Sequence, residues 1–194
     1  MIEIMILLHC KKLTEKISLL NIINEQIYYN NVDTFSKGVA FFIRNNIKSS
    51  IEYVSSFDGR FLHITYKEND VIYDIINIYA PNSVKEKVLF FKKVSDQLPS
   101  STRLILLGDF NNTLAEIDRC GKTLHTFDQS FKAIVEMMSK HNVIDIWRKR
   151  NDRTKLSLEK KLEKEYLYKA VLITFWFPEQ LICMLEIFFM LKQL

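Results

Sequence analysis

The chain has 194 residues, 48% of them hydrophobic and 26% charged, so it can bury one sizeable core and is globular in composition. Its 27 basic and 23 acidic side chains leave a formal charge of +4, an ordinary surplus that does not by itself indicate a phosphate-bearing partner. Three cysteines without CxxC or His-interleaved spacing argue against both a zinc site and a disulfide framework.

Two apolar stretches near the ends of the chain indicate neither export nor a membrane span. The run IMILL at Ile4–Leu8 is too short for a secretory segment, and lysines follow it where a cleavage site would be expected. Polar residues and Pro178 interrupt the apolar stretch from Ala170 to Leu191. We therefore expect an intracellular protein, nuclear or cytoplasmic, without a signal peptide or a membrane partner.

Strand patterns dominate the middle of the chain. Four segments are rich in β-branched and aromatic residues and are bounded by turn residues such as Asp58-Gly59. They are GVAFFI at Gly38–Ile43, RFLHITY at Arg60–Tyr66, VIYDIINIYA at Val71–Ala80 and RLILLGDF at Arg103–Phe110.

Two segments with helical periodicity follow in chain order. From Ser83 to Leu98, after an Ala-Pro-Asn break, apolar residues recur at helical spacing, namely Val84, Val88, Phe91 and Val94 or Ser95. The segment Phe127–His141 places one apolar face on Phe131, Ile134, Val135 and Met138, and Asp128 can cap its start.

The composition changes after the second helix. The stretch from Lys149 to Lys169 is rich in Lys, Glu and Arg, which is typical of a solvated helix or a connection. We expect one domain over residues 1–150, followed by a charged connection and an apolar tail over residues 151–194.

The motif LLGDFNN at Leu106–Asn112 carries the clearest chemical signal. In an extended backbone, Asp109 and Asn111 would share one face, because alternate side chains point the same way. A carboxylate can orient or deprotonate an attacking water, while an amide can donate to a phosphate oxygen as its charge grows. The structural alternative is a strand-end turn, where Asp and Asn are also common.

The motif INIYAPN places Tyr79 at another strand end, where its phenol could donate to a phosphate, although a rim tyrosine is the commoner explanation. The chain resembles the endonuclease domain of non-LTR (LINE-type) retrotransposons in the order and approximate spacing of four segments. These are GVAFFIRNNI, INIYAPN, LLGDFNN followed by Asp118-Arg119, and NVIDIWR at Asn142–Arg148. That domain belongs to the endonuclease/exonuclease/phosphatase superfamily, with the apurinic endonucleases and exonuclease III. The resemblance covers about Ile27 to Arg148.

The resemblance implies an α/β fold of the DNase I-like type, here a partial four-layer sandwich of two packed mixed β-sheets flanked by helices. It implies metal-dependent phosphodiester cleavage of DNA with Mg²⁺, and a reverse transcriptase region once fused downstream. Asp109 would handle the nucleophilic water, Asn111 would hold the water and bind the phosphate, and Tyr79 would contact the phosphate. Asn82 would line the same phosphate-binding loop.

Several motifs of that family are missing from this sequence. They are an N-terminal Asn, the metal-binding Glu of a Gln-Glu-Thr-His motif, an Arg-Ile-Asp-Tyr segment and a Ser-Asp-His. Codons compatible with His9–Thr14, read one nucleotide out of phase, can spell Leu-Gln-Glu-Thr-His. Codons for Lys169–Phe177 can likewise spell Ser-Arg-Ile-Asp-Tyr-Phe-Leu-Val, so we expect that both ends are read out of frame.

The leading hypothesis is therefore an endonuclease domain that is catalytically inactive in this copy, with no metal ligand because the family Glu is missing. One alternative is a non-catalytic nucleic-acid-binding remnant that keeps Lys and Arg contacts to phosphate. Another is a phosphoesterase of the same superfamily that acts on a small phosphoester, although the Ala-Pro-Asn loop favours the nucleic-acid branch.

Overall fold

The computed structural model describes residues 2–8, 25–32, 38–44, 50–101, 103–112, 114, 127–145, 149, 172–174 and 184–189. These form two compact units, the first built from residues 1–79 and 177–194 and the second from residues 80–176. The predictions for residues 9–14, 118–119, 146–148 and 150–169 lie outside the described residues, and the domain boundary expected at residue 150 stays a prediction.

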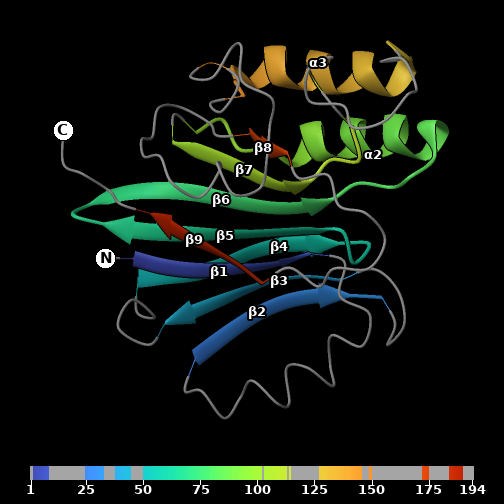
Figure 1. Cartoon of the computed structure of the whole chain (residues 1–194). Helices are drawn as coiled ribbons and strands as arrows, with labels where there is room; N and C mark the ends of the chain where they lie inside the picture. Colours follow the sequence, from blue (N-terminus) through green and yellow to red (C-terminus); the bar gives the residue numbers. More distant parts are fainter. Residues whose placement is uncertain are drawn as a thin grey trace. The chain divides into compact units, whose positions relative to one another are not determined.

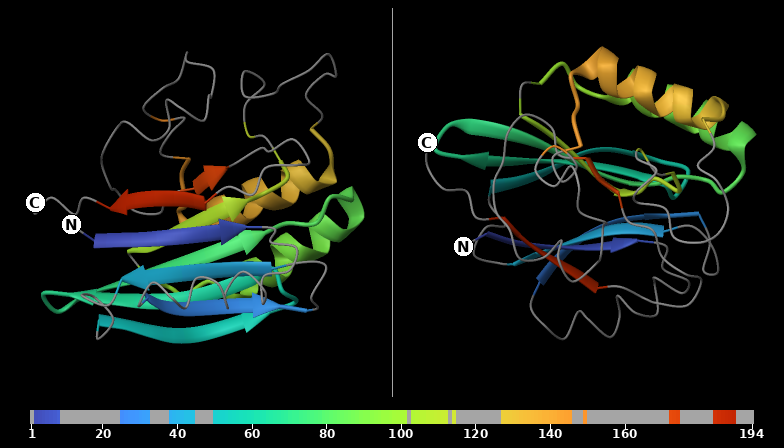
Figure 2. Two further views of the ribbon diagram at one scale, coloured as in Figure 1. Left: turned by 60° about the horizontal axis from the view of Figure 1, so that its bottom comes forward. Right: turned by 45° about the horizontal axis from the view of Figure 1, so that its top comes forward.

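The first unit contains a four-stranded antiparallel sheet in the order β2-β3-β1-β9. Its strands are β1 (Ile2–Leu8), β2 (Glu25–Asn31), β3 (Gly38–Arg44) and β9 (Met184–Phe189). Segments from opposite ends of the sequence lie side by side in it, because β9 pairs with β1 from Ile2↔Phe189 to Leu7↔Met184 (Figure 2). Part of the apolar tail is thus a strand.

An antiparallel meander of β4 (Ile51–Phe57), β5 (Phe61–Glu68) and β6 (Val71–Tyr79) completes the first unit (Figure 1). The β4–β5 turn contains Asp58 and Gly59 with φ of 54° and 61°, and the N–H of Arg60 donates to the carbonyl of Phe57 at 3.0 Å. Positive φ at both central residues is typical of a hairpin turn that matches the strand twist, which is why an Asp-Gly pair stands there.

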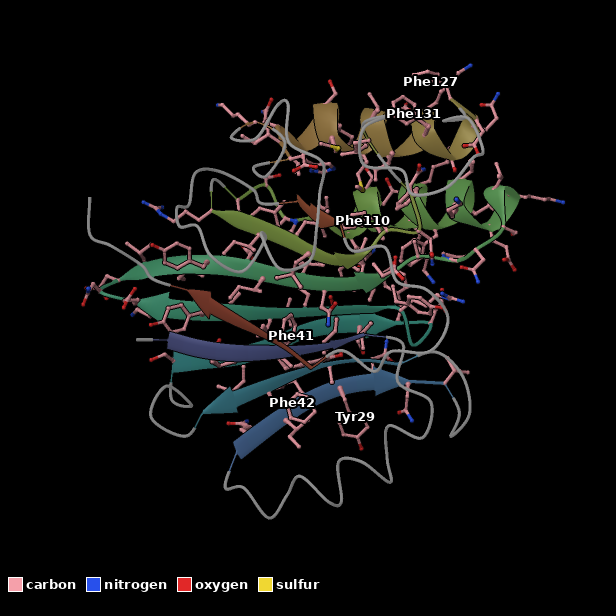
Figure 3. The ribbon with its side chains drawn as sticks, in the orientation of Figure 1. Tyr29, Phe41, Phe42, Phe110, Phe127 and Phe131 are labelled. Atoms are coloured by element: carbon pink, nitrogen blue, oxygen red, sulfur yellow. The ribbon has the colours of Figure 1, made fainter. Side chains whose placement is uncertain are left out.

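The meander packs against the four-stranded sheet through a largely apolar interior. Phe41 and Phe42 on β3 are both buried although they alternate in direction along the strand (Figure 3). Two hydrogen bonds of polar side chains lie inside: Asn77 Nδ2 donates to the carbonyl of Ala40 at 3.2 Å, and buried His63 Nε2 lies 2.8 Å from Asp74 Oδ1. His63 is thus a strand residue with a structural partner.

The second unit holds α2 (Val84–Gln97), β7 (Leu104–Asp109), α3 (Gln129–His141) and β8 (Leu172–Thr174). β8 runs parallel to β7, pairing Leu106 with Leu172. The helices α2 and α3 lie side by side (Figure 1). Ser83 caps α2 in a reciprocal arrangement, accepting from the N–H of Glu86 at 3.3 Å and donating to its carboxylate at 2.7 Å.

The sequence predicted both helices and part of the buried face of each, namely Phe91, Val94 and Ser95 on α2 and Ile134 on α3. α2 buries Lys87, Phe90, Phe91, Val94 and Ser95, whereas Val84 is exposed. α3 buries Ser130, Ala133, Ile134 and Met137, whereas Val135 is exposed. The apolar periodicity did not predict the buried Lys87, Ser130 and Ala133. Asp128 caps α3 as predicted, accepting from the N–H groups of Ser130 and Phe131.

The four predicted strands correspond to β3, β5, β6 and β7, so the expected α/β class with β-sheets and two helices is confirmed. Within the described part of the chain, no helix combines the length and the apolar character needed to cross a membrane.

Candidate active site at the end of strand β7

Asp109 ends β7, the strand whose residues are all buried. Gly108 precedes it with φ of 131°, a conformation in which a Cβ atom would clash, so glycine is required at this position. The Asp109 residue is 8% exposed. Phe110, the residue after Asp109, is buried, and its ring stacks on Phe91 of α2 with the ring centroids 6.4 Å apart (Figure 3).

Asn111 turns the chain directly after this anchor. Its φ is 44°, in the left-handed region that asparagine tolerates better than most residues, and its N–H donates to Asp109 Oδ1 at 2.9 Å. The expectation that an extended backbone would place both side chains on one face is therefore wrong, because the strand ends at Asp109. A hydrogen-bonded turn brings Asp109 and Asn111 together instead.

Ala80 holds this turn from the segment that precedes α2. Its N–H donates to the carbonyl of Asp109 at 2.7 Å, and its carbonyl accepts from the Asn111 side-chain amide at 2.6 Å. These two bonds fasten the start of the Ala-Pro-Asn loop to the end of β7. They also commit one amide N–H of Asn111 to the protein.

Lys87, near the start of α2, supplies a cation beside the turn. Its Nζ donates to the carbonyl of Asn111 at 2.8 Å, and the residue is 8% exposed. Burial lowers the pKa of Lys87 below its ordinary value, and the nearby carboxylates of Asp128 and Asp109 partly offset that lowering. The turn therefore has a positive neighbour that sequence analysis did not single out.

Asp128 at the start of α3 is the second carboxylate near Lys87. Burial alone would raise the pKa of Asp128, but the net effect of its surroundings brings that pKa below its ordinary value. The carboxylate accepts hydrogen bonds from the Ser130 side chain and from the N–H groups of Phe131 and Ser130, and Lys87 attracts it. Ser130 also accepts from the Asn112 side chain at 3.2 Å, which ties the residue after the turn to the start of α3.

Tyr79 belongs to the first unit, where Arg60 holds it. The two residues extend the β5–β6 ladder, with the N–H of Tyr79 donating to the carbonyl of Arg60 at 2.8 Å. The guanidinium of Arg60 donates to the carbonyl of Tyr79 at 3.0 Å, and its Cζ lies 4.7 Å from the centroid of the Tyr79 ring. Arg60 is a second cation that sequence analysis missed.

The predicted site residues thus fall into separate groups. Asp109 and Asn111 are in direct contact, and Asn82 lies exposed in the loop that begins with the bonded Ala80. Tyr79 is buried in the first unit, with Arg60 as its partner. The predicted roles of these four residues stay predictions.

The chain is similar in sequence to one transposon-encoded protein and in fold to an endonuclease. It is 29% identical over 133 residues to the "Transposon TX1 uncharacterized 149 kDa protein" of Xenopus laevis, a match that covers 66% of this chain and 10% of that protein. An AP endonuclease from Archaeoglobus fulgidus has a TM-score of 0.58 at 15% identity, covering 79% of this chain and 65% of that one. The predicted resemblance to a retrotransposon endonuclease domain is confirmed.

The archaeal structure also confirms the DNase I-like α/β fold of the chain. The endonuclease domain of TRAS1, a telomere-specific non-LTR retrotransposon, has a TM-score of 0.47 at 8% identity, covering 63% of this chain and 55% of that one. No family model matches the chain. It spans only a small part of the transposon protein it resembles in sequence, as the 10% coverage shows.

The prediction that this chain lacks the metal-binding Glu stays a prediction, because residues 9–14 lie outside the described part of the chain. Across the residues that the structure describes, no three His, Cys, Asp or Glu side chains lie close enough together to hold a metal ion. Near the turn, the available carboxylates are Asp109, which accepts from Asn111, and Asp128, which caps a helix. Mg²⁺ depends on carboxylate and other oxygen ligands, and each of these carboxylates keeps lone pairs beyond its printed hydrogen bonds.

Proposed function

We propose that this chain is a retrotransposon-type DNA endonuclease domain that does not cleave DNA efficiently in this copy. The observation that carries the proposal is the turn from Asp109 to Asn111, fastened to Ala80 at the start of the Ala-Pro-Asn loop. Such a turn holds a carboxylate and an amide at the end of a buried strand, which suits phosphodiester hydrolysis. The likeness to a transposon protein supports DNA as the substrate class.

In the proposed chemistry, Asp109 accepts a proton from water as the water oxygen attacks phosphorus, the bond from phosphorus to the 3′ oxygen breaks, and the leaving 3′ oxygen takes a proton from solvent. Asn111 and Tyr79 donate to non-bridging phosphate oxygens, and Asn82 lines the loop. Mg²⁺ is the cofactor of the proposed ancestral reaction and would neutralise charge on the phosphate. This chain lacks the Glu and the Ser-Asp-His that the family requires, so we propose that the remaining residues bind DNA without cutting it.

A nicking assay tests the proposal. Purified chain is incubated with supercoiled plasmid and Mg²⁺, and conversion to open circles is compared between wild type and Asp109→Asn. We expect no difference between them. Nicking by the wild type that Asp109→Asn abolishes would show an intact endonuclease and overturn the inactive assignment.

A binding measurement tests the DNA partner separately. Fluorescence anisotropy with a labelled duplex should show affinity that falls steeply with salt and depends little on sequence, because phosphate contacts release counterions. Absence of binding at low salt would contradict the proposal. Asp109-dependent hydrolysis of a soluble phosphomonoester would point instead to the small-phosphoester branch of the superfamily.

A further inference from the structure

We infer that Arg60 is a phosphate-binding residue at the end of the β5–β6 ladder, and that it takes a non-bridging oxygen of a nucleic-acid strand beside Tyr79. The inference rests on the proposed function for its ligand class, and it adds a residue outside the motifs that indicated that function. Its basis is the geometry of Arg60 itself.

The hairpin turn fixes where Arg60 lies. Asp58 and Gly59 reverse the chain with positive φ, and the N–H of Arg60 closes the turn on the carbonyl of Phe57. Arg60 therefore enters the ladder opposite Tyr79, one pair beyond the pairing of Phe61 with Ile78. The position follows from register, so it does not depend on a flexible side chain.

Two contacts then fix the guanidinium. One N–H donates to the carbonyl of Tyr79 at 3.0 Å, and the cation lies over the Tyr79 ring with Cζ 4.7 Å from its centroid. An arginine side chain that is already ordered loses little conformational entropy when it binds an anion. Arg60 is thus preorganised.

The remaining donors of Arg60 have no protein acceptor in the described ranges. A guanidinium carries several N–H donors arranged as a planar fork, and the structure gives one of them an acceptor, a neutral carbonyl. Arg60 is half-buried, and in the residues that the structure describes no carboxylate pairs with it. A half-buried, oriented cation without a counter-charge is suited to a phosphate, which can accept two parallel N–H bonds.

The test measures how DNA affinity depends on salt. Neutralising one phosphate contributes about 0.9 to the slope of log affinity against log salt on duplex DNA. Arg60→Gln should lower the magnitude of that slope by about one and weaken binding about tenfold or more. Arg60→Lys should keep the slope. Lys67→Gln is the matched control, because it removes a cation from the other end of β5, where Lys67 pairs with Asp70 at 3.1 Å.

The outcomes separate this inference from the proposed function. If wild type binds DNA and folded Arg60→Gln keeps the wild-type slope, the inference is wrong while the proposed function stands. If wild type does not bind DNA, the proposed function fails, and Arg60 is then tested by NMR with inorganic phosphate. A saturable shift of the Arg60 side-chain N–H signals, absent in Lys67, supports the anion site, and no shift overturns it. The same NMR readout applies if Arg60→Gln does not fold.

Discussion

Lys87 donates from Nζ to the backbone carbonyl of Asn111 at 2.8 Å, although a buried cation near the start of α2 is opposed by the helix dipole. The surrounding charges explain why it stands there. Asp109 and Asp128 both attract the ammonium, so Lys87 links the end of β7 with the starts of α2 and α3.

Replacing Lys87 by Met should raise the carboxyl pKa of Asp128, because the cation that attracts the carboxylate is removed. Carbon-13 NMR of the side-chain carboxyl across an acid titration measures this pKa. Lys92→Met on the exposed side of the same helix is the control and should leave it unchanged. An unchanged Asp128 pKa in folded Lys87→Met would show that the two groups do not interact.

Asn111→Asp should destabilise the fold by about 1–3 kcal/mol, because it replaces the donor that faces the carbonyl of Ala80 with an acceptor. Asn111→Gly is the matched variant: it also loses the amide, but it adopts the positive φ of 44° without strain and leaves no opposed acceptor. Urea unfolding of the three proteins gives the comparison. Equal stability of the Asp and Gly variants would mean that the bond to Ala80 is not formed in solution.

Tyr66 on β5 makes stability depend on alkaline pH. The pKa of Tyr66 is raised from the ordinary 10.0 to about 12, mainly because the phenol is buried. The charge of Glu68, a hydrogen bond with Glu68 and the charge of Tyr73 raise it further. A folded-state pKa above the unfolded value means that this contribution is complete below pH 10.0 and is lost as the pH rises towards 12. The free energy of unfolding should fall by about 2 kcal/mol over that range.

Tyr66→Phe tests this assignment, since the variant should lack that part of the alkaline loss. The measurement is the free energy of unfolding from urea titrations at several alkaline pH values. Tyr53→Phe, at an exposed position on β4, is the control and should behave as the wild type. An identical pH dependence in Tyr66→Phe and wild type would assign the loss to other groups.

Sequencing the transcript across the codons for Leu8–Thr14 and Lys169–Phe177 tests the frame prediction. We expect extra or missing nucleotides relative to the phase that gives the present sequence, so that Gln-Glu-Thr-His and Ser-Arg-Ile-Asp-Tyr are restored. The restored protein would then be assayed as a Mg²⁺ endonuclease. A transcript that matches the present sequence, with no such motifs in its other phases, contradicts the frameshift account.

Elements with strong local signals could be predicted from the sequence. β-branched runs predicted β3, β5, β6 and β7, and the Asp58-Gly59 pair predicted a turn, which the structure shows to be a hairpin turn. β2 and β4 were missed because their sequences, EQIYYNN and IEYVSSF, contain many polar residues and are half-exposed. Their pairing comes from neighbouring strands, which local propensity does not report.

The structure brings Asp109 and Asn111 of the predicted site into contact, and their roles stay predictions, but the sequence analysis overlooked the cations Arg60 and Lys87. Arg60 and Lys87 were overlooked because isolated cations are usually solvated. A signal existed for each. Counting outward from the hairpin turn places Arg60 opposite Tyr79, and Lys87 stands four residues before Phe91 on the buried face of α2. A cation on a buried helical face needs an opposite charge nearby, so Lys87 could have been matched with a carboxylate such as Asp109.

The bonds that fasten the end of β7 largely use main-chain atoms as partners. The acceptors are the backbone carbonyls of Asp109, Ala80 and Asn111. A substitution at any of these three residues keeps its carbonyl. A gene copy that drifts without selection loses side-chain chemistry with single codon changes, whereas a peptide group is encoded at every position. If the chain is the inactive copy proposed above, the bond from the Ala80 N–H to the Asp109 carbonyl, which joins two main-chain groups, is expected to outlast the bonds from the Asn111 and Lys87 side chains.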